Sequence, residues 1–191
     1  MATEVYLLRH GALDVAPGTL VGSTDPALPV MDRREEHCLR TGRLLEGMDV
    51  WFCSPMLRCR QTMDQLRQQH GIGGDVCYDD RLREMDFGRW EMQSFAAIST
   101  ADPEYVDSWS RYTDFVFPDG EAVADFCDRN RAMLDLFMTH DAEKIGVITH
   151  GGVIRTMICL SLGISVRNYL LFDVQPASLT ILQLFSQGGV L

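Results

Sequence analysis

Two histidines stand at the ends of short apolar segments, and glycine follows each of them. His10 comes after residues 4–8, and His150 comes after residues 144–149. Apolar runs of this length are typical of buried strands in a parallel sheet, and ligands bind at the carboxyl ends of such strands. A histidine held there can act as a nucleophile, a general base or a metal ligand. If the two strands are neighbours, the histidines face each other across one pocket.

Two arginines are placed to join these histidines. Arg9 directly precedes the first histidine, and Arg58 lies just inside the helix expected after the apolar residues 50–53 and a Ser-Pro turn. The N-terminus of a helix favours anions, and a guanidinium fork matches the oxygens of a phosphate. Two histidines and two arginines around one point therefore predict a site for a phosphate-like anion.

The rest of the chain alternates between strand-like and helix-like patterns. Strands are expected at residues 4–8, 50–53, 75–78, 144–149, 170–174 and 179–184, and loops at 12–31 and 80–91. Helices are expected from Asp32 to Gly47, from Pro55 onwards, within residues 95–115, from Val123 to Phe137 and from Val153 onwards. This alternation predicts an α/β fold, a three-layer α/β/α sandwich with a mostly parallel central sheet, to which the last two strands add an antiparallel edge.

The composition narrows the class of protein and its partners. The chain has 191 residues, 46% of them apolar and 23% charged, and no run approaches the roughly 20 apolar residues of a membrane span. A net charge of −10 without a basic block argues against nucleic acid and anionic membranes as partners. The six cysteines lack zinc spacing and no secretory signal is visible, so we expect reduced thiols in a cytoplasmic protein. We expect one domain over residues 1–191 and leave a homodimer open as its assembly.

Four motifs, taken in order, resemble those of the histidine phosphatase superfamily, which has the phosphoglycerate mutase-like fold. They are Leu-Arg-His-Gly at residues 8–11, Ser-Pro-Met-Leu-Arg-Cys-Arg-Gln-Thr at 54–62, Leu-Arg-Glu-Met-Asp-Phe-Gly-Arg-Trp-Glu at 82–91, and Thr-His-Gly-Gly-Val-Ile-Arg at 149–155. Together they span most of the chain. Within the superfamily, residues 84–91 are most similar to the α-ribazole phosphatases of cobalamin synthesis.

The resemblance implies a role for each matching residue. His10 would be the nucleophile that forms a phosphohistidine, and Glu84 would protonate the leaving oxygen and then activate water. Arg9, Arg58 and His150 would hold the phosphoryl oxygens and stabilise charge in the transition state, with no metal or cofactor. The substrate-binding residues are expected to be Arg9, Arg58, His150, Gly151, Trp90 and Trp109.

The chain departs from the family pattern directly after its first motif. The family often continues with Glu-Thr and then an asparagine three residues after the threonine, whereas this chain has Ala12, Leu13 and Ala16 at those positions. A phosphate contact from that amide must be replaced or lost. The segment around residues 32–34 also lacks the small-residue start usual in the family. Neither departure changes the expected nucleophile, arginines or acid.

The expected partner is a small phosphorylated substrate, and the resemblance favours α-ribazole 5′-phosphate. The aromatic residues expected to form a lid over its flat base are Phe87, Trp90, Trp109, Tyr112 and Phe115. A broad-specificity phosphatase remains an alternative. A phosphoglycerate mutase-like enzyme is less favoured because the chain has no obvious insertion. A non-catalytic phospholigand-binding module would not need the acid, and a metallohydrolase would need more clustered ligands than the two histidines.

Overall fold

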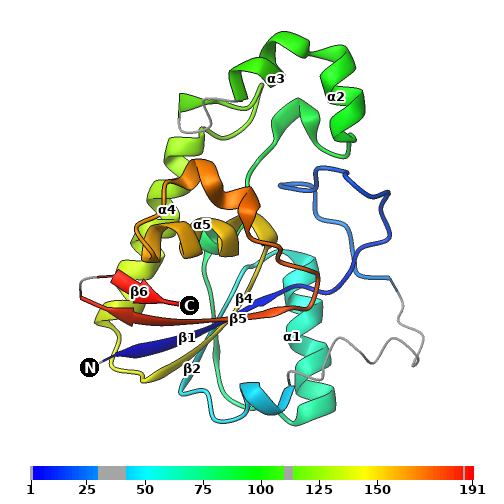
Figure 1. Cartoon of the computed structure of the whole chain (residues 1–191). Helices are drawn as coiled ribbons and strands as arrows, with labels where there is room; N and C mark the ends of the chain where they lie inside the picture. Colours follow the sequence, from blue (N-terminus) through cyan, green and yellow to red (C-terminus); the bar gives the residue numbers. More distant parts are fainter. Residues whose placement is uncertain (1, 30–41, 110–113, 187) are drawn as a thin grey trace.

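The computed structural model describes residues 2–29, 42–109, 114–186 and 188–191, and six strands form its central sheet (Figure 1). The strands are β1 (Thr3–Arg9), β2 (Val50–Cys53), β3 (Val76–Tyr78), β4 (Lys144–Thr149), β5 (Leu179–Phe185) and β6 (Gly188–Val190). Their order across the sheet is β3-β2-β4-β1-β5-β6. β3, β2, β4 and β1 run parallel, while β5 is antiparallel to both β1 and β6, so the sheet is mostly parallel, as the sequence predicts.

β1 and β4 lie side by side, which joins the two histidine motifs. In their register Arg9 pairs with Thr149, and the backbone N–H of His10 donates to the carbonyl of Thr149 over 3.0 Å. Both strands therefore deliver their histidines at the same edge of the sheet. β1 is an interior strand, but its second neighbour β5 is antiparallel, whereas the sequence suggested a strand inside a parallel sheet.

Helices cover both faces of the sheet and complete three layers (Figure 1). α4 (Val123–Thr139) and α5 (Gly151–Ser161) pack on the face to which β1 contributes Val5 and Leu7. α1 (Leu57–His70) packs on the opposite face, against Leu8 of the same strand. Alternate residues of a strand point to opposite faces, so the apolar run of β1 fills two separate cores. This burial on both faces confirms the predicted sandwich.

A smaller helical arm stands beyond the carboxyl ends of the parallel strands (Figure 1). It contains α2 (Phe95–Ala101) and α3 (Pro103–Trp109), and short 3-10 helices precede it at Asp80–Leu82 and Gly88–Trp90. The predicted loop at residues 12–31 is irregular as far as residue 29. These connections lie at the same edge as the two histidine motifs and supply walls for a site there.

Three predicted elements differ from the structure. Residues 170–174, expected as a strand, belong to a 3-10 helix (Val166–Leu171) and the loop after it, and Leu170 and Leu171 are 68% and 78% exposed. The antiparallel partner of β5 at the sheet edge is β6 instead. Pro55 precedes α1 rather than lying in its first turn, because Met56 is the extended N-cap residue.

Other expectations lie partly outside the described residues. The first part of the helix expected from Asp32 lies in an undescribed segment, and so do Cys38 and Tyr112. Within the remaining part of that expected helix, a 3-10 helix is present at Gly42–Leu45. Among the helices that are described, none combines the length and apolar character needed to cross a membrane.

Candidate active site

The imidazoles of His10 and His150 meet at the shared edge of β1 and β4. Their ring centroids are 5.2 Å apart, with the planes inclined at 60°. His10 is 4% exposed and His150 is fully buried. The sequence-based prediction that the two strands are neighbours and bring the histidines together is confirmed.

The hydrogen bonds of His10 define which ring nitrogen is free. Its Nδ1 lies 2.7 Å from the carbonyl oxygen of Gly11. A carbonyl only accepts, so in the neutral ring Nδ1 carries the proton and Nε2 keeps its lone pair. Burial, followed by the charges of Arg58 and Arg9, lowers the pKa of His10 from 6.5 to about 3. His10 is therefore a neutral imidazole at physiological pH, with an unprotonated nitrogen.

His150 is held from two sides. Its Nδ1 accepts from Nε of Arg58 over 3.1 Å, and its Nε2 lies 2.8 Å from Oγ of Ser54. Because the guanidinium can only donate, Nε2 carries the proton and donates to the serine. Burial and then the charge of Arg58 lower the pKa of His150 well below its ordinary value. The second histidine is thus also neutral, and both of its ring nitrogens have protein partners.

Arg58 is fully buried and bound to the loop that follows the first histidine motif. Besides His150, it donates through Nη2 to the carbonyl of Gly22 and through Nη1 to the carbonyl of Thr24, both over 2.9 Å. Nη1 also lies 3.3 Å from a carboxylate oxygen of Asp25. The predicted convergence with the histidines is present, but protein groups occupy most of its donors. Neither Arg58 nor His150 is among the residues that line the adjacent cavity.

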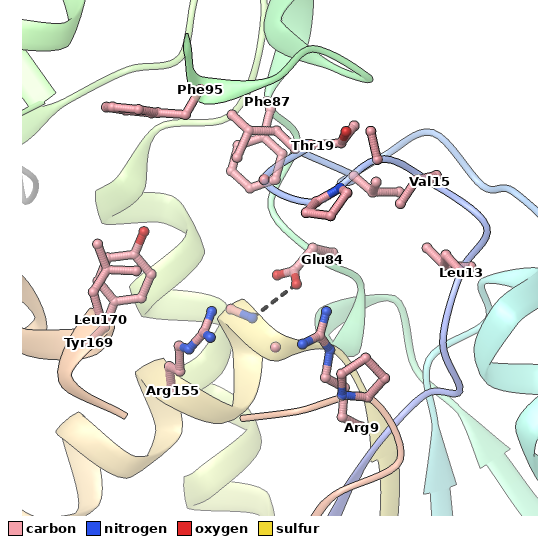
Figure 2. A pocket seen from close by; sticks show the side chains of 18 of the residues that line it. Arg9, Leu13, Val15, Thr19, Glu84, Phe87, Phe95, Arg155, Tyr169 and Leu170 are labelled. Carbon is pink, nitrogen blue, oxygen red and sulfur yellow. Dashed lines mark hydrogen bonds between the residues drawn. The ribbon is translucent and has the colours of Figure 1, made fainter. Parts of the chain in front are cut away.

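A cavity of about 820 Å³ opens beside His10, and Arg9, Glu84 and Gly151 also line it (Figure 2). Arg9 donates through Nη1 to the carbonyl of Val174 over 2.6 Å. Its Nε is buried and has no hydrogen-bond partner in the described structure. A buried N–H left unpaired is costly, so this group is suited to a ligand oxygen.

The carboxylate of Glu84 faces the same cavity. Oε2 accepts from the backbone N–H of Gly152 over 2.9 Å, and Oε1 accepts from that of Met85 over 3.1 Å. A Cβ at position 152 would lie 2.4 Å from Oε1, so glycine lets the carboxylate stay where it is and a larger residue would displace it. This second glycine after His150 fixes the position of the acid.

The two tryptophans expected to bind substrate lie against each other, with ring centroids 5.9 Å apart, but only one of them lines the cavity. Trp109 lines the cavity. Trp90 does not, because it is 1% exposed and packs among other aromatic rings, including Phe115 and Phe117. Its indole Nε1 donates to Asp102 over 2.7 Å, which provides the polar partner that a buried tryptophan needs. The prediction that Trp90 contacts substrate is therefore wrong, and this residue belongs to the core.

Sequence reasoning missed two cationic residues of the cavity. Arg155 and Arg167 line it, and Figure 2 shows Arg155 and Arg9 reaching in from the side opposite to Phe87, with Glu84 between. Arg155 lies one helical turn after Gly151, a spacing that could have placed it on the cavity side of α5. Arg167 belongs to the 3-10 helix Val166–Leu171, in a part of the chain for which the sequence predicts no element, and no sequence signal marks it.

The opposite wall of the cavity is apolar and comes from the irregular loop after the first motif. It includes Leu13, Val15, Ala16, Pro17, Leu20 and Val21. Ala16, which replaces the asparagine of the family pattern, thus lies in the cavity without offering a polar group. Among the described residues, no group of three or more His, Cys, Asp or Glu side chains is arranged to hold a metal ion.

Comparisons with known proteins agree with this architecture. The model of the histidine phosphatase superfamily (branch 1) matches residues 5–191. Phosphoserine phosphatase 1 of Hydrogenobacter thermophilus is 24% identical over 191 residues, covering 98% of this chain and 90% of that protein. A Citrobacter koseri protein named "Probable phosphoglycerate mutase GpmB" is 25% identical over 170 residues, covering 84% and 75%. The crystal structure of the alpha-ribazole phosphatase from Shigella flexneri superposes with a TM-score of 0.80 at 23% identity, covering 99% and 94%.

Proposed function

Because the chain belongs to the histidine phosphatase superfamily and is a phosphatase, we propose that it hydrolyses phosphate monoesters through a phosphohistidine on His10. The observation that carries this proposal is the neutral His10, whose Nε2 has no partner among the described residues, beside the unpaired Nε of Arg9. A nucleophile and an anion-binding donor thus stand together in one cavity. Glu84 faces the same space.

In the first step, Nε2 of His10 attacks phosphorus and the bond to the ester oxygen breaks. Glu84, protonated for this step, gives its proton to the leaving alcohol. In the second step the Glu84 carboxylate takes a proton from water, the water oxygen attacks phosphorus, and the bond to Nε2 breaks. Inorganic phosphate leaves, and both His10 and Glu84 return to their starting states.

Charge on the phosphoryl oxygens is stabilised from several directions. Arg9 supplies Nε–H directly, and the N-terminus of α5, which begins at Gly151, adds its partial positive charge. Arg58 and His150 support the same site from one layer further out, since their hydrogen-bond partners are protein groups. Arg58 also helps to lower the pKa of His10 and so keeps the nucleophile neutral.

Covalent catalysis can be tested by trapping the intermediate. Radiolabelled substrate, quenched in alkali, is expected to leave label on the parent protein, and acid treatment is expected to remove it because phosphoramidates are acid-labile. His10→Ala should abolish both label and turnover, while His70→Ala, a change at the end of α1 outside the cavity lining, should keep both. Turnover at the parent rate in His10→Ala would refute the assignment.

For the substrate, we favour α-ribazole 5′-phosphate. A cavity of about 820 Å³ suits a ligand of drug-like size, well beyond a phosphate group alone. The apolar loop wall, together with Phe87 and Trp109, offers flat contact for an uncharged base. Solved structures named as alpha-ribazole phosphatases share the fold, which is consistent with this choice.

Phosphoserine or a similar phosphate ester carrying a carboxylate is the second candidate. Arg155 and Arg167 line the cavity in addition to Arg9, and guanidinium groups suit a carboxylate. The H. thermophilus relatives are named as phosphoserine phosphatases. The two substrates therefore use different walls of one cavity.

A direct comparison of kcat/KM decides between them. If α-ribazole 5′-phosphate is the substrate, it should exceed phosphoserine and 3-phosphoglycerate by at least about tenfold, or roughly 1.4 kcal/mol. Trp109→Ala should then erode the preference and Arg167→Ala should not. The reverse pattern would favour the carboxylate-bearing ester, and equal values for all three would indicate a broad-specificity phosphatase.

A further inference from the structure

Arg129, on the second turn of α4, reaches the backbone of the segment that carries Glu84. Its Nη1 donates to the carbonyls of Arg81 and Arg83, over 2.7 and 2.5 Å. Its Nη2 donates to the carbonyl of Glu84 itself over 3.0 Å. One side chain, more than forty residues away in the sequence, thus binds three carbonyls around the acid.

Glu121 holds the other side of the same guanidinium. Its Oε1 accepts from Nε of Arg129 over 2.7 Å, and its Oε2 accepts from Nη2 over 3.0 Å. The backbone of Glu121 also donates to the carbonyl of Asp86 over 2.9 Å, and its Oε2 accepts from the N–H of Asp86 over 3.3 Å. The Arg129–Glu121 pair therefore forms hydrogen bonds to residues 81–86 on both sides of Glu84. Each partner is only 18% exposed.

The segment needs this support because regular structure does not provide it. Residues 83–87 belong to no helix or strand, so no ladder of backbone hydrogen bonds fixes them. The carboxylate of Glu84 is tied to the start of α5, and its backbone carbonyl is tied to α4. Catalytic groups have to be held to within about 0.5 Å of the productive position. These two attachments connect the acid to two helices of the sandwich.

We propose that Arg129, with Glu121, is a positioning pair for the general acid. This inference rests on the proposed role of Glu84. The guanidinium of Arg129 packs over the ring of Phe126, with its carbon 4.4 Å from the ring centroid, so its fork has a fixed direction. Lysine would keep the charge but present a single ammonium, which cannot serve three carbonyls and a bidentate carboxylate together. Arg129→Lys therefore releases the acid without changing the charge of the protein.

The readout is the dependence of the rate on the leaving group. p-Nitrophenolate leaves with little help from an acid, whereas the alkoxide of an alkyl phosphate needs a proton. General acid catalysis as a whole contributes about 10²–10⁴-fold. Because Arg129→Lys displaces the acid, it should lower kcat on an alkyl phosphate at least tenfold more than on p-nitrophenyl phosphate, with KM changed less than about twofold. Arg131→Met on the same helix, which removes an exposed ion pair to Asp128, is the matched control and should change neither rate.

A double variant shows whether Arg129 acts through Glu84. Glu84→Gln alone should produce the full leaving-group contrast, and Arg129→Lys combined with Glu84→Gln should add no further loss on the alkyl phosphate. Equal losses on both substrates in Arg129→Lys, or none, while Glu84→Gln shows the contrast, would overturn the positioning role alone. If Glu84→Gln shows no contrast, the acid assignment fails and the inference fails with it. Should Arg129→Lys not fold, Glu121→Gln carries the same test.

Discussion

The low pKa of His10 has a measurable consequence for stability. An unfolded chain binds a proton at this histidine below pH 6.5, whereas folded His10 remains neutral until the pH approaches 3. The unfolded state therefore binds more protons between these values, and the free energy of unfolding falls as the pH falls through that window. The contribution is fully present above pH 6.5 and is lost progressively towards pH 3.

The size of the effect follows from the two pKa values. Each pKa unit corresponds to about 1.36 kcal/mol, so the linkage between pH 7 and pH 5 amounts to about 2 kcal/mol for His10 alone. His10→Asn removes the titrating ring, while its amide can still donate to the carbonyl of Gly11, the partner of Nδ1. His150 has a pKa lowered in the same direction and should leave some pH dependence in the variant.

Urea unfolding at pH 7 and pH 5, in buffers without phosphate, measures this difference. The drop in unfolding free energy between the two pH values should be about 2 kcal/mol smaller in His10→Asn than in the parent protein. Thr156→Val alters a buried side chain whose hydroxyl has no partner among the described residues, and it should keep the parental drop. An unchanged drop in His10→Asn would refute the conclusion that the folded protein keeps this imidazole neutral.

Three further results are expected. Gly152→Ala should displace the end of the Glu84 side chain, because the new Cβ would lie 2.4 Å from Oε1. It should lower kcat on alkyl phosphates at least tenfold, with little change in melting temperature. An equal loss on p-nitrophenyl phosphate would contradict this expectation. Trp90→Ala should lower the unfolding free energy by about 3–5 kcal/mol, as shown by denaturation. Trp109→Ala should lower it less, because that ring is only partly buried, and should in addition weaken binding of the base, as shown by KM. Activity should persist in EDTA and be inhibited by vanadate, which resembles five-coordinate phosphorus; reversible loss on chelation would favour a metal-dependent reaction.

The sequence is most informative where one strand end carries both structure and chemistry. β1 and β4 are short apolar runs that end in His-Gly, so their pairing and the meeting of His10 with His150 could be predicted together. The apolar residues 170 and 171 show the limit of the same reasoning. They resemble a strand, but they belong to the 3-10 helix that forms a cavity wall, where Leu170 remains exposed.

Side-chain destinations in irregular segments were much harder to predict. Trp90 and Trp109 both lie outside the sheet, and nothing in their spacing shows that one faces the core and the other the cavity. Arg129 looks like an ordinary surface residue of an amphipathic helix, because its three backbone partners come from one short 3-10 turn and the irregular residues after it. Such contacts depend on how loops pack, which local sequence patterns do not encode.

The acidic residues around the site explain how a chain of net charge −10 maintains a cavity for an anion. The carboxylate of Glu91 accepts from the backbone N–H groups of residues 22, 23, 24 and 87, and that of Asp25 accepts from the N–H of Leu57 at the start of α1. Both carboxylates are thus hydrogen-bonded to backbone N–H groups, and the carboxylate of Glu121 forms an ion pair with Arg129. Glu84 is the one carboxylate among the described cavity-lining residues, against three arginines. The field that a phosphate ester meets is therefore set by these few side chains, and the overall charge of the protein says little about it.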